Sequence, residues 1–164
     1  MLVLGIDPGP AVTGFGAVEK RRGRLYLVDA GFIRTSSKDP MAHRLAAIYD
    51  GLERAITEVR PDAVAIESIF KHKSAESALR LGHARGVALL AATRCGYEPA
   101  EYNPMTIKRT VGAHGRADKK AVARMVGMLL GSLPDGPADV TDALAIAITH
   151  HHHARVLAAR SIAR

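Results

Sequence analysis

The chain has 164 residues, which is long enough to bury one sizeable core and too short for two domains of ordinary size. Hydrophobic residues make up 48% of it, a fraction that excludes a disordered protein. Lysine and arginine outnumber aspartate and glutamate by 23 to 16, so the protein suits a polyanionic partner such as nucleic acid, although the same excess can serve solubility alone.

The N-terminal part of the chain predicts three strands. Residues 2–6 form a short apolar run that ends at the turn Asp7-Pro8-Gly9-Pro10, as expected for a buried strand. Two further strand-like runs, near 12–19 and 25–34, are separated by the basic turn Lys20 to Arg24. The three runs together predict an antiparallel meander.

A long helix and a second buried strand follow the meander. Apolar residues recur every three or four positions over 41–59, which predicts one apolar helix face. Residues 62–67 then predict a strand parallel to the first. Without repeats or low-complexity linkers, we expect one α/β domain over 1–153 and a basic C-terminal tail over 154–164. The other elements expected are a short strand over 97–102 and helices over 74–94, 104–111, 122–129 and about 139–153.

Targeting signals are not expected. Met1 to Ile6 is apolar, but Asp7 interrupts it without a basic leader, so we expect neither a secretory signal nor a membrane span. Cys95 is the only cysteine, which excludes an internal disulfide and a cysteine-based zinc site. A chain without disulfides suits a reducing compartment, so we expect a cytoplasmic location and no membrane partner.

Acidic side chains end both predicted buried strands. Alternation along a strand places Asp7 on the same face as Gly5, and Glu67 on the same face as Ala65. These small neighbours leave room beside the acids. The carboxyl edge of an open α/β sheet is also where ligands bind.

The last predicted helix supplies two more acids. Asp139 and Asp142 are three residues apart and therefore share a helix face. If this helix packs across the sheet, four carboxylates converge, and burying them is costly unless cations neutralise them. Oxygen ligands without histidine or cysteine suit Mg²⁺ or Mn²⁺, and two such ions about 4 Å apart form a clamp for phosphodiester hydrolysis.

Three of the acids also have a structural explanation. Asp7 could cap the following turn, Asp139 could cap the helix N-terminus, and Asp142 could favour the positive end of the helix dipole. Glu67 has no such common role, because it ends an apolar run. The four acids together favour a metal site.

Four blocks of the sequence stand out: LGIDPGPAVTGFG (4–16), AIESIF (65–70), SALRLGHARGVA (77–88) and ADVTDALAIAITH (138–150). Together they resemble the RuvC-type Holliday junction resolvases, which are crossover junction endodeoxyribonucleases. The match spans about residues 2–153, in the family's order. The resemblance implies a ribonuclease H-like fold with a central mixed five-stranded sheet flanked by helices. It also implies an endonuclease that nicks opposing strands of four-way DNA junctions in recombination and repair.

The resemblance also assigns roles to individual residues. The metal-binding catalytic acids would be Asp7, Glu67, Asp139 and Asp142, holding two Mg²⁺ ions that Mn²⁺ can replace. Matched DNA-contacting positions are Phe70, which would stack at the junction, and Lys108 and Lys119 near the scissile phosphate. Lys71, Lys73, Arg116 and Lys120 surround the expected site and are further candidates for phosphate contact. The family further implies a homodimer and a branch-migration helicase complex as partner.

The chain departs from the family pattern in two places. Gly112-Ala113-His114-Gly115 replaces the usual Gly-x-Gly before Lys119, and Ser74 stands where asparagine is expected. Both departures bear on sequence preference, because they fall where DNA contact is expected. His114 is a candidate for protonating the leaving group.

Other charged residues have simpler interpretations. Arg80 and Arg85 are at least as readily part of a solvated face as of a DNA contact. We interpret His150 to His153 as the exposed end of a native helix, where only His150 and His153 can share a face.

Two other functions fit parts of the sequence. Asp7-Pro8-Gly9 followed by Thr13-Gly14 resembles the first phosphate loop of actin-like ATPases and sugar kinases. Those enzymes need two such domains and a second Gly-rich loop, for which this chain is too short. Basic charge alone would also permit a non-catalytic junction-binding module, against which the four clustered carboxylates argue.

Overall fold

The computed structural model describes residues 1–68, 74–112 and 118–154, together with the backbone of the last helix beyond them. Within this part of the chain, no helix combines the length and apolar character needed to cross a membrane. The elements are β1 (Leu2–Asp7), β2 (Val12–Arg21), β3 (Arg24–Arg34), α1 (Met41–Val59), β4 (Ala63–Glu67), α2 (Ala75–Arg94), β5 (Ala100–Tyr102), α3 (Pro104–Val111), α4 (Lys119–Leu130) and α5 (Ala138–Ile162).

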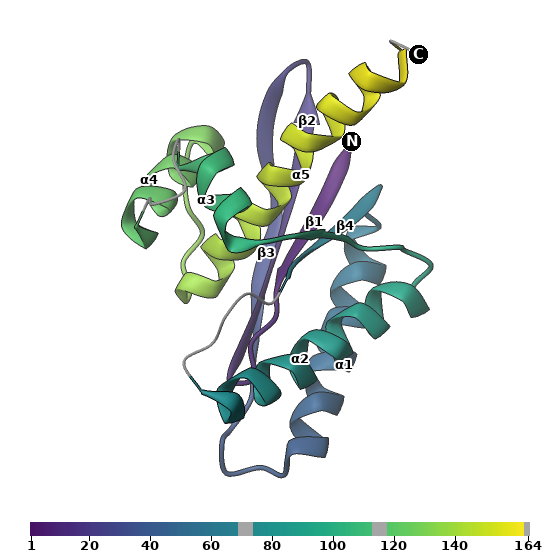
Figure 1. Ribbon diagram of the computed structural model, residues 1–164, viewed down its shortest axis with the longest axis vertical. Helices are drawn as coiled ribbons and strands as arrows, with labels where there is room; N and C mark the ends of the chain where they lie inside the picture. Colours follow the sequence, from purple (N-terminus) through teal and green to yellow (C-terminus); the bar gives the residue numbers. More distant parts are fainter. Residues whose placement is uncertain (69–73, 113–117, 163–164) are drawn as a thin grey trace.

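The strands form one mixed sheet in the order β3-β2-β1-β4-β5. β2 pairs antiparallel with both β1 and β3, while β4 lies parallel to both β1 and β5. The predicted meander, the parallel crossover through α1 and the five-stranded mixed sheet are therefore confirmed (Figure 1). Because β1 is the central strand, its carboxyl end lies in the middle of one sheet edge.

The meander turns more tightly than predicted. Arg22 and Gly23 alone connect β2 to β3, and both have a positive φ, of 47° and 84°. Positive φ at both central residues is the geometry of a two-residue type I′ hairpin, which matches the twist of the strands. The prediction of a turn over Lys20 to Arg24 is therefore wrong at its ends, which belong to the strands.

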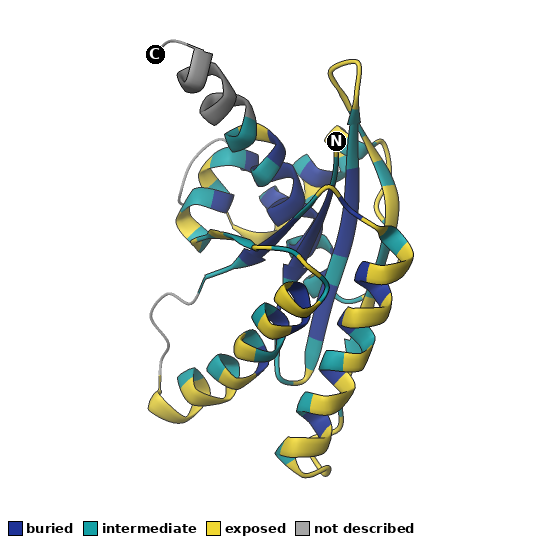
Figure 2. Ribbon diagram, turned by 90° about the vertical axis from the view of Figure 1, so that its right-hand side faces the viewer, coloured by how far each residue is buried: buried dark blue, intermediate teal, exposed yellow. Residues whose placement is uncertain are grey.

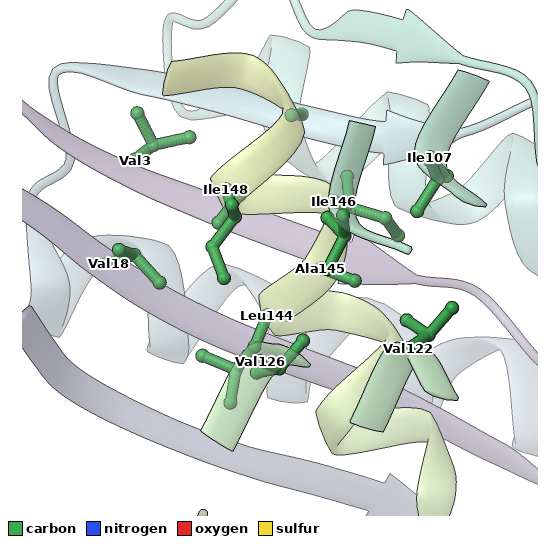
Figure 3. Close-up of a cluster of buried hydrophobic side chains, with 12 residues drawn as sticks. Val3, Val18, Ile107, Val122, Val126, Leu144, Ala145, Ile146 and Ile148 are labelled. Atoms are coloured by element: carbon green, nitrogen blue, oxygen red, sulfur yellow. The ribbon is translucent and has the colours of Figure 1, made fainter. Parts of the chain in front are cut away.

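Each face of the sheet carries its own core. Leu4 and Ile6 of β1 join a core with α1 and α2, while Val3 joins a core with α3, α4 and α5. α1 and α2 are buried on the side toward the sheet and exposed on the outer side (Figure 2). On the other face, side chains of the strands, α3 and α4 surround α5, among them Val18, Ile107 and Val126 (Figure 3).

α5 lies directly on β1 and β2, backbone against backbone. A Cβ atom on Gly5 would stand 2.1 Å from the carbonyl oxygen of Ala143, and one on Gly14 would stand 2.1 Å from that of Asp139. Both distances are far inside van der Waals contact, so only glycine permits this approach. The contact fixes the first turns of α5 above the carboxyl end of β1.

The histidine run is not an exposed helix end, which corrects the prediction. α5 continues to Ile162 rather than ending near His153, so the domain boundary predicted there falls within a helix and stays a prediction. His151 is 1% exposed, and its Nε2–H donates to the carbonyl oxygen of Val18 at 2.8 Å, beside a bulge in β2. His150 and His153 do share a face, since both rings pack on Tyr102 of β5, with centroid distances of 5.9 and 5.4 Å.

Buried His151 makes stability depend on pH. Its Nδ1 atom is buried with no hydrogen-bond partner among the described residues, and burial lowers the pKa of the ring. The unfolded chain therefore takes up this proton first, so the contribution of His151 is full above a pH of about 6.5 and is lost as the pH falls below it. His151→Gln should reduce the loss of unfolding free energy between about pH 7 and about pH 5, measured by urea unfolding, because its amide can still donate to Val18. The same change at exposed His152 is the control, and equal pH profiles for both variants would contradict this account.

Candidate active site

Asp7 and Glu67 lie side by side at the carboxyl edge of the sheet. β1 and β4 are parallel with Ile6 opposite Ile66, so the next residue of each strand is one of these acids. Both side chains are half-buried. They line a cavity of about 250 Å³ together with Pro104, Ile107, Lys108, Lys119, Val122, Asp142 and Ile146.

α5 brings its two acids to the same edge. Asp142 lines the cavity with Asp7 and Glu67. Asp139, one turn earlier, is not among the residues that line the cavity, but its charge helps to raise the pKa of Asp7, and its Oδ1 atom would be 3.9 Å from a Cβ atom on Gly9. The structure therefore gathers three of the predicted acids around one cavity, with Asp139 beside them.

Burial and neighbouring acids raise the pKa of both Asp7 and Glu67. Burial raises the pKa of Asp7 well above its usual value, and the charges of Glu67, Asp142 and Asp139 add to the effect. Burial also raises the pKa of Glu67, followed by the charge of Asp142, while a hydrogen bond from Asp7 opposes the shift. A negative charge at this edge is thus both desolvated and repelled, so the cluster favours positive charge nearby.

Other groups fill the structural roles considered for the acids. The turn after Asp7 is closed by Thr13, whose Oγ1 donates to the Gly9 carbonyl at 2.9 Å and accepts from the Gly9 amide at 3.3 Å. Asp139 lies inside the first turn of α5 rather than at its N-cap, so that interpretation is wrong. Asp142 forms an ion pair rather than standing free at the helix end.

Two of the predicted basic residues reach the cavity. Lys108 of α3 lines it, and Lys119, the first residue of α4, donates from Nζ to Oδ2 of Asp142 at 2.8 Å. Lys120 is exposed next to Lys119. The remaining DNA-contact predictions, Phe70, Lys71, Lys73 and Arg116, lie outside the described residues, as does His114.

Two arginines of α2 form ion pairs outside the cavity. Arg80 pairs with Glu76 one turn away on α2, and Arg85 pairs with Glu101 of β5. Their interpretation as structural surface charges is therefore favoured.

The replacement of asparagine by Ser74 has a local explanation. Ser74 is the N-cap of α2, and its Oγ atom accepts a hydrogen bond from the Ser77 amide at 3.2 Å. Serine and asparagine are equally good N-cap residues, so the helix begins in the same way with either.

Sequence reasoning missed the residues that hold the site in place. Thr13 fixes the turn after Asp7, and Gly14 seats the first turn of α5. The signal for Gly14 was available, because β1 and β2 carry Gly5, Gly14 and Gly16 within two short strands. Glycines concentrated in a buried sheet mark a close approach of another backbone.

The donor set fits a hard divalent cation. Every acid of the cluster offers carboxylate oxygens, and the surrounding charge is negative. Among the described residues, no three histidine, cysteine, aspartate or glutamate side chains are already arranged to hold a metal ion. Lys119 pairs with Oδ2 of Asp142, so this ion pair would have to loosen for that oxygen to act as a ligand.

The close backbone contact between α5 and β2 can be tested by adding a single methyl group. Gly14→Ala should lower the free energy of unfolding by about 1 to 3 kcal/mol, because the methyl group pushes α5 away from the sheet. Gly127→Ala in α4 is the control, since its Cβ would meet Leu133 at an ordinary 3.4 Å. That change should stabilise the helix by at most about 1 kcal/mol. Equal stability of the two variants in urea unfolding would show that the close contact is not required.

Known proteins resemble the chain over nearly its whole length. The family model described as "Crossover junction endodeoxyribonuclease RuvC" matches residues 3–150. The Syntrophotalea carbinolica protein of that name is 49% identical over 152 residues, which is 93% of this chain and 94% of the relative. A structure of Thermus thermophilus RuvC in complex with Holliday junction substrate is 37% identical, with a TM-score of 0.88 over 95% of this chain and 96% of that one.

A distant structure shares only the fold. The yeast mitochondrial Holliday junction resolvase Ydc2 is 12% identical, with a TM-score of 0.63 over 90% of this chain and 76% of that chain. Together with the Thermus structure, it confirms the predicted ribonuclease H-like class. With a matching family model and close relatives over almost every residue, the chain belongs to the RuvC family of crossover junction endodeoxyribonucleases.

Proposed function

We propose that this protein is a structure-selective DNA endonuclease that resolves four-way junctions in recombination and repair by nicking opposing strands. The observation that carries the proposal is one cavity at the sheet edge in which Asp7, Glu67 and Asp142 face Lys108 and Lys119. Carboxylates can hold cations there, and ammonium groups can hold a phosphodiester. The Thermus relative, solved with a Holliday junction substrate, supports the choice of junction DNA.

The proposed cofactor is a pair of Mg²⁺ ions, which Mn²⁺ can replace, held by Asp7, Glu67, Asp139 and Asp142. Bound there, the ions would supply an activated water and charge at the leaving 3′ oxygen. The strands hold Asp7 and Glu67 at fixed spacing, while α5 presents its acids from above. Burial and the repulsion of neighbouring acids raise the pKa of Asp7, and this supports the proposal because divalent cations relieve the repulsion.

The basic residues would position the DNA backbone. Lys108 and Lys119 stand where the scissile phosphate would approach the acids, and Lys120 extends the positive charge outward. Phosphate contacts of this kind carry no sequence information and weaken as salt is added. Phe70, Lys71, Lys73 and Arg116 stay predictions of further contacts.

Removing one acid charge should abolish cutting without abolishing binding. Asp7→Asn and Glu67→Gln keep the side-chain size but remove a cation ligand, so we expect nicking to fall at least about a hundredfold. The assay is a gel of a labelled four-way junction and a linear duplex, with Mg²⁺ or EDTA. The wild-type protein should make paired nicks in the junction alone and with Mg²⁺ alone. Glu58→Gln on exposed α1 is the matched control.

Other outcomes of this assay point to the alternative functions. Near wild-type cutting by either variant would contradict the assignment of the acids. Tight junction binding by the wild-type protein without cleavage in Mg²⁺ or Mn²⁺ would favour a binding module. Neither binding nor cleavage, combined with ATP binding in calorimetry, would favour the actin-like class.

The outer face of α2 supports the proposed homodimer. Leu79 and Leu90 are 62% and 52% exposed. With exposed His83 and Gly86 they form a stripe at spacings of four, three and four residues, the pattern of a helix seam. Alanines cover the opposite face of α2 and pack on the core, so the leucines have no role there. Pairing α2 with its copy would bury both stripes and give two sites for two strands.

A charge placed on the stripe should separate the subunits. Leu90→Glu should convert a dimer to a monomer in sedimentation equilibrium, because the carboxylate would be buried at the seam. Met128→Glu is the control, since Met128 is 75% exposed on α4, away from α2. A monomeric wild-type protein, or a dimer that survives Leu90→Glu, would contradict this interface.

The proposal also includes a partner and a location. Family resemblance supports a branch-migration helicase complex, which would move junctions along DNA, as partner. The single cysteine supports a cytoplasmic location, because it leaves the fold independent of disulfide formation.

A further inference from the structure

A lysine of the chain itself partly neutralises the negative charge of the cavity lined by Asp7, Glu67 and Asp142. The Nζ atom of Lys119 lies 2.8 Å from Oδ2 of Asp142, well within hydrogen-bond distance. The Asp142 side chain is 26% exposed, and the Lys119 side chain is 76% exposed, so the pair stands at the mouth of the cavity. The ammonium group closes the cluster from the solvent side.

The start of α4 holds Lys119 in this position. The side chain of Asp118 accepts a hydrogen bond from the Ala121 amide at 2.7 Å and so caps the helix immediately before Lys119. Val122 follows one turn later on the same helix face, is buried and lines the same cavity. The packing of α4 therefore directs Lys119 toward the acids, whereas neighbouring Lys120 does not line the cavity.

The ion pair and a bound cation would compete for the same carboxylate. A divalent ion held by Asp7, Glu67 and Asp142 would attract the carboxylate of Asp142 and repel the ammonium group of Lys119. We propose that Lys119 is an internal counter-ion of the metal-free protein, which leaves Asp142 when a divalent cation binds and is then free to take a DNA phosphate. This inference rests on the proposed metal site and describes how that site is regulated.

The exchange couples metal binding to DNA binding. A phosphate that accepts Lys119 removes a competitor from Asp142, so DNA should raise the affinity of the protein for the cation. Thermodynamic linkage requires the cation to raise DNA affinity by the same factor. The protein would thus load its metal most readily with DNA in place.

The test measures Mn²⁺ affinity directly, without relying on cutting. Calorimetric titration at one ionic strength would compare the wild-type protein with Lys119→Met and with Arg124→Met, which removes a positive charge from an exposed position of the same helix. Without DNA, Lys119→Met should bind Mn²⁺ at least about threefold more tightly than both other proteins, given the usual strength of exposed ion pairs. Lys119→Arg keeps the charge and should bind Mn²⁺ as the wild-type protein does.

A second titration measures the coupling. Adding a non-cleavable four-way junction should raise Mn²⁺ affinity in the wild-type protein and in Arg124→Met, but much less in Lys119→Met. Equal Mn²⁺ affinities for the two methionine variants, or weaker Mn²⁺ binding by Lys119→Met, would overturn the counter-ion proposal. Either result would leave the nuclease assignment intact. A wild-type protein that neither binds Mn²⁺ nor cuts junctions would overturn the proposed function as well.

Discussion

The absence of a side chain at Gly5 and Gly14, where α5 touches the sheet, is the constraint on which the site depends. Gly5 and Gly14 let the helix backbone touch the strand backbone, so a helix bearing two acids meets two strands bearing two more. Their spacing is set by main-chain contact rather than by the fit of flexible side chains. Backbone seating of this kind positions charged groups more firmly than loops do, because both elements belong to the buried core.

Gathering acids at one edge of the sheet is unfavourable because like charges repel. Basic residues from two helices partly offset this repulsion. The strands and α5 supply negative charge, while the short helices α3 and α4 supply Lys108 and Lys119. Opposite charges therefore come from different parts of the fold. This division would let Lys119 leave Asp142, as proposed, without disturbing the strands that hold Asp7 and Glu67.

Local patterns in the sequence predict most of the fold, because they report which side of an element is buried. Alternation placed Asp7 and Glu67 on the face toward α5, and the three-and-four spacing predicted α1. Contacts between distant residues leave no such pattern. His151 bonds a backbone carbonyl 133 positions earlier, and Lys119 meets an acid 23 positions later. The end of α5 was also missed, although the absence of glycine and proline after His153 is consistent with a helix that continues.

The two halves of the site differ in how firmly the fold holds them. β1 is paired on both sides within the sheet, whereas α3 and α4 are helices of eight and twelve residues at its margin. Amide hydrogens of β1 should therefore exchange with solvent only through global unfolding, and those of α3 and α4 through smaller openings. Mild denaturant or heat would then withdraw the lysines from the acids while the sheet stays folded. Loss of the site would precede any loss of strand structure.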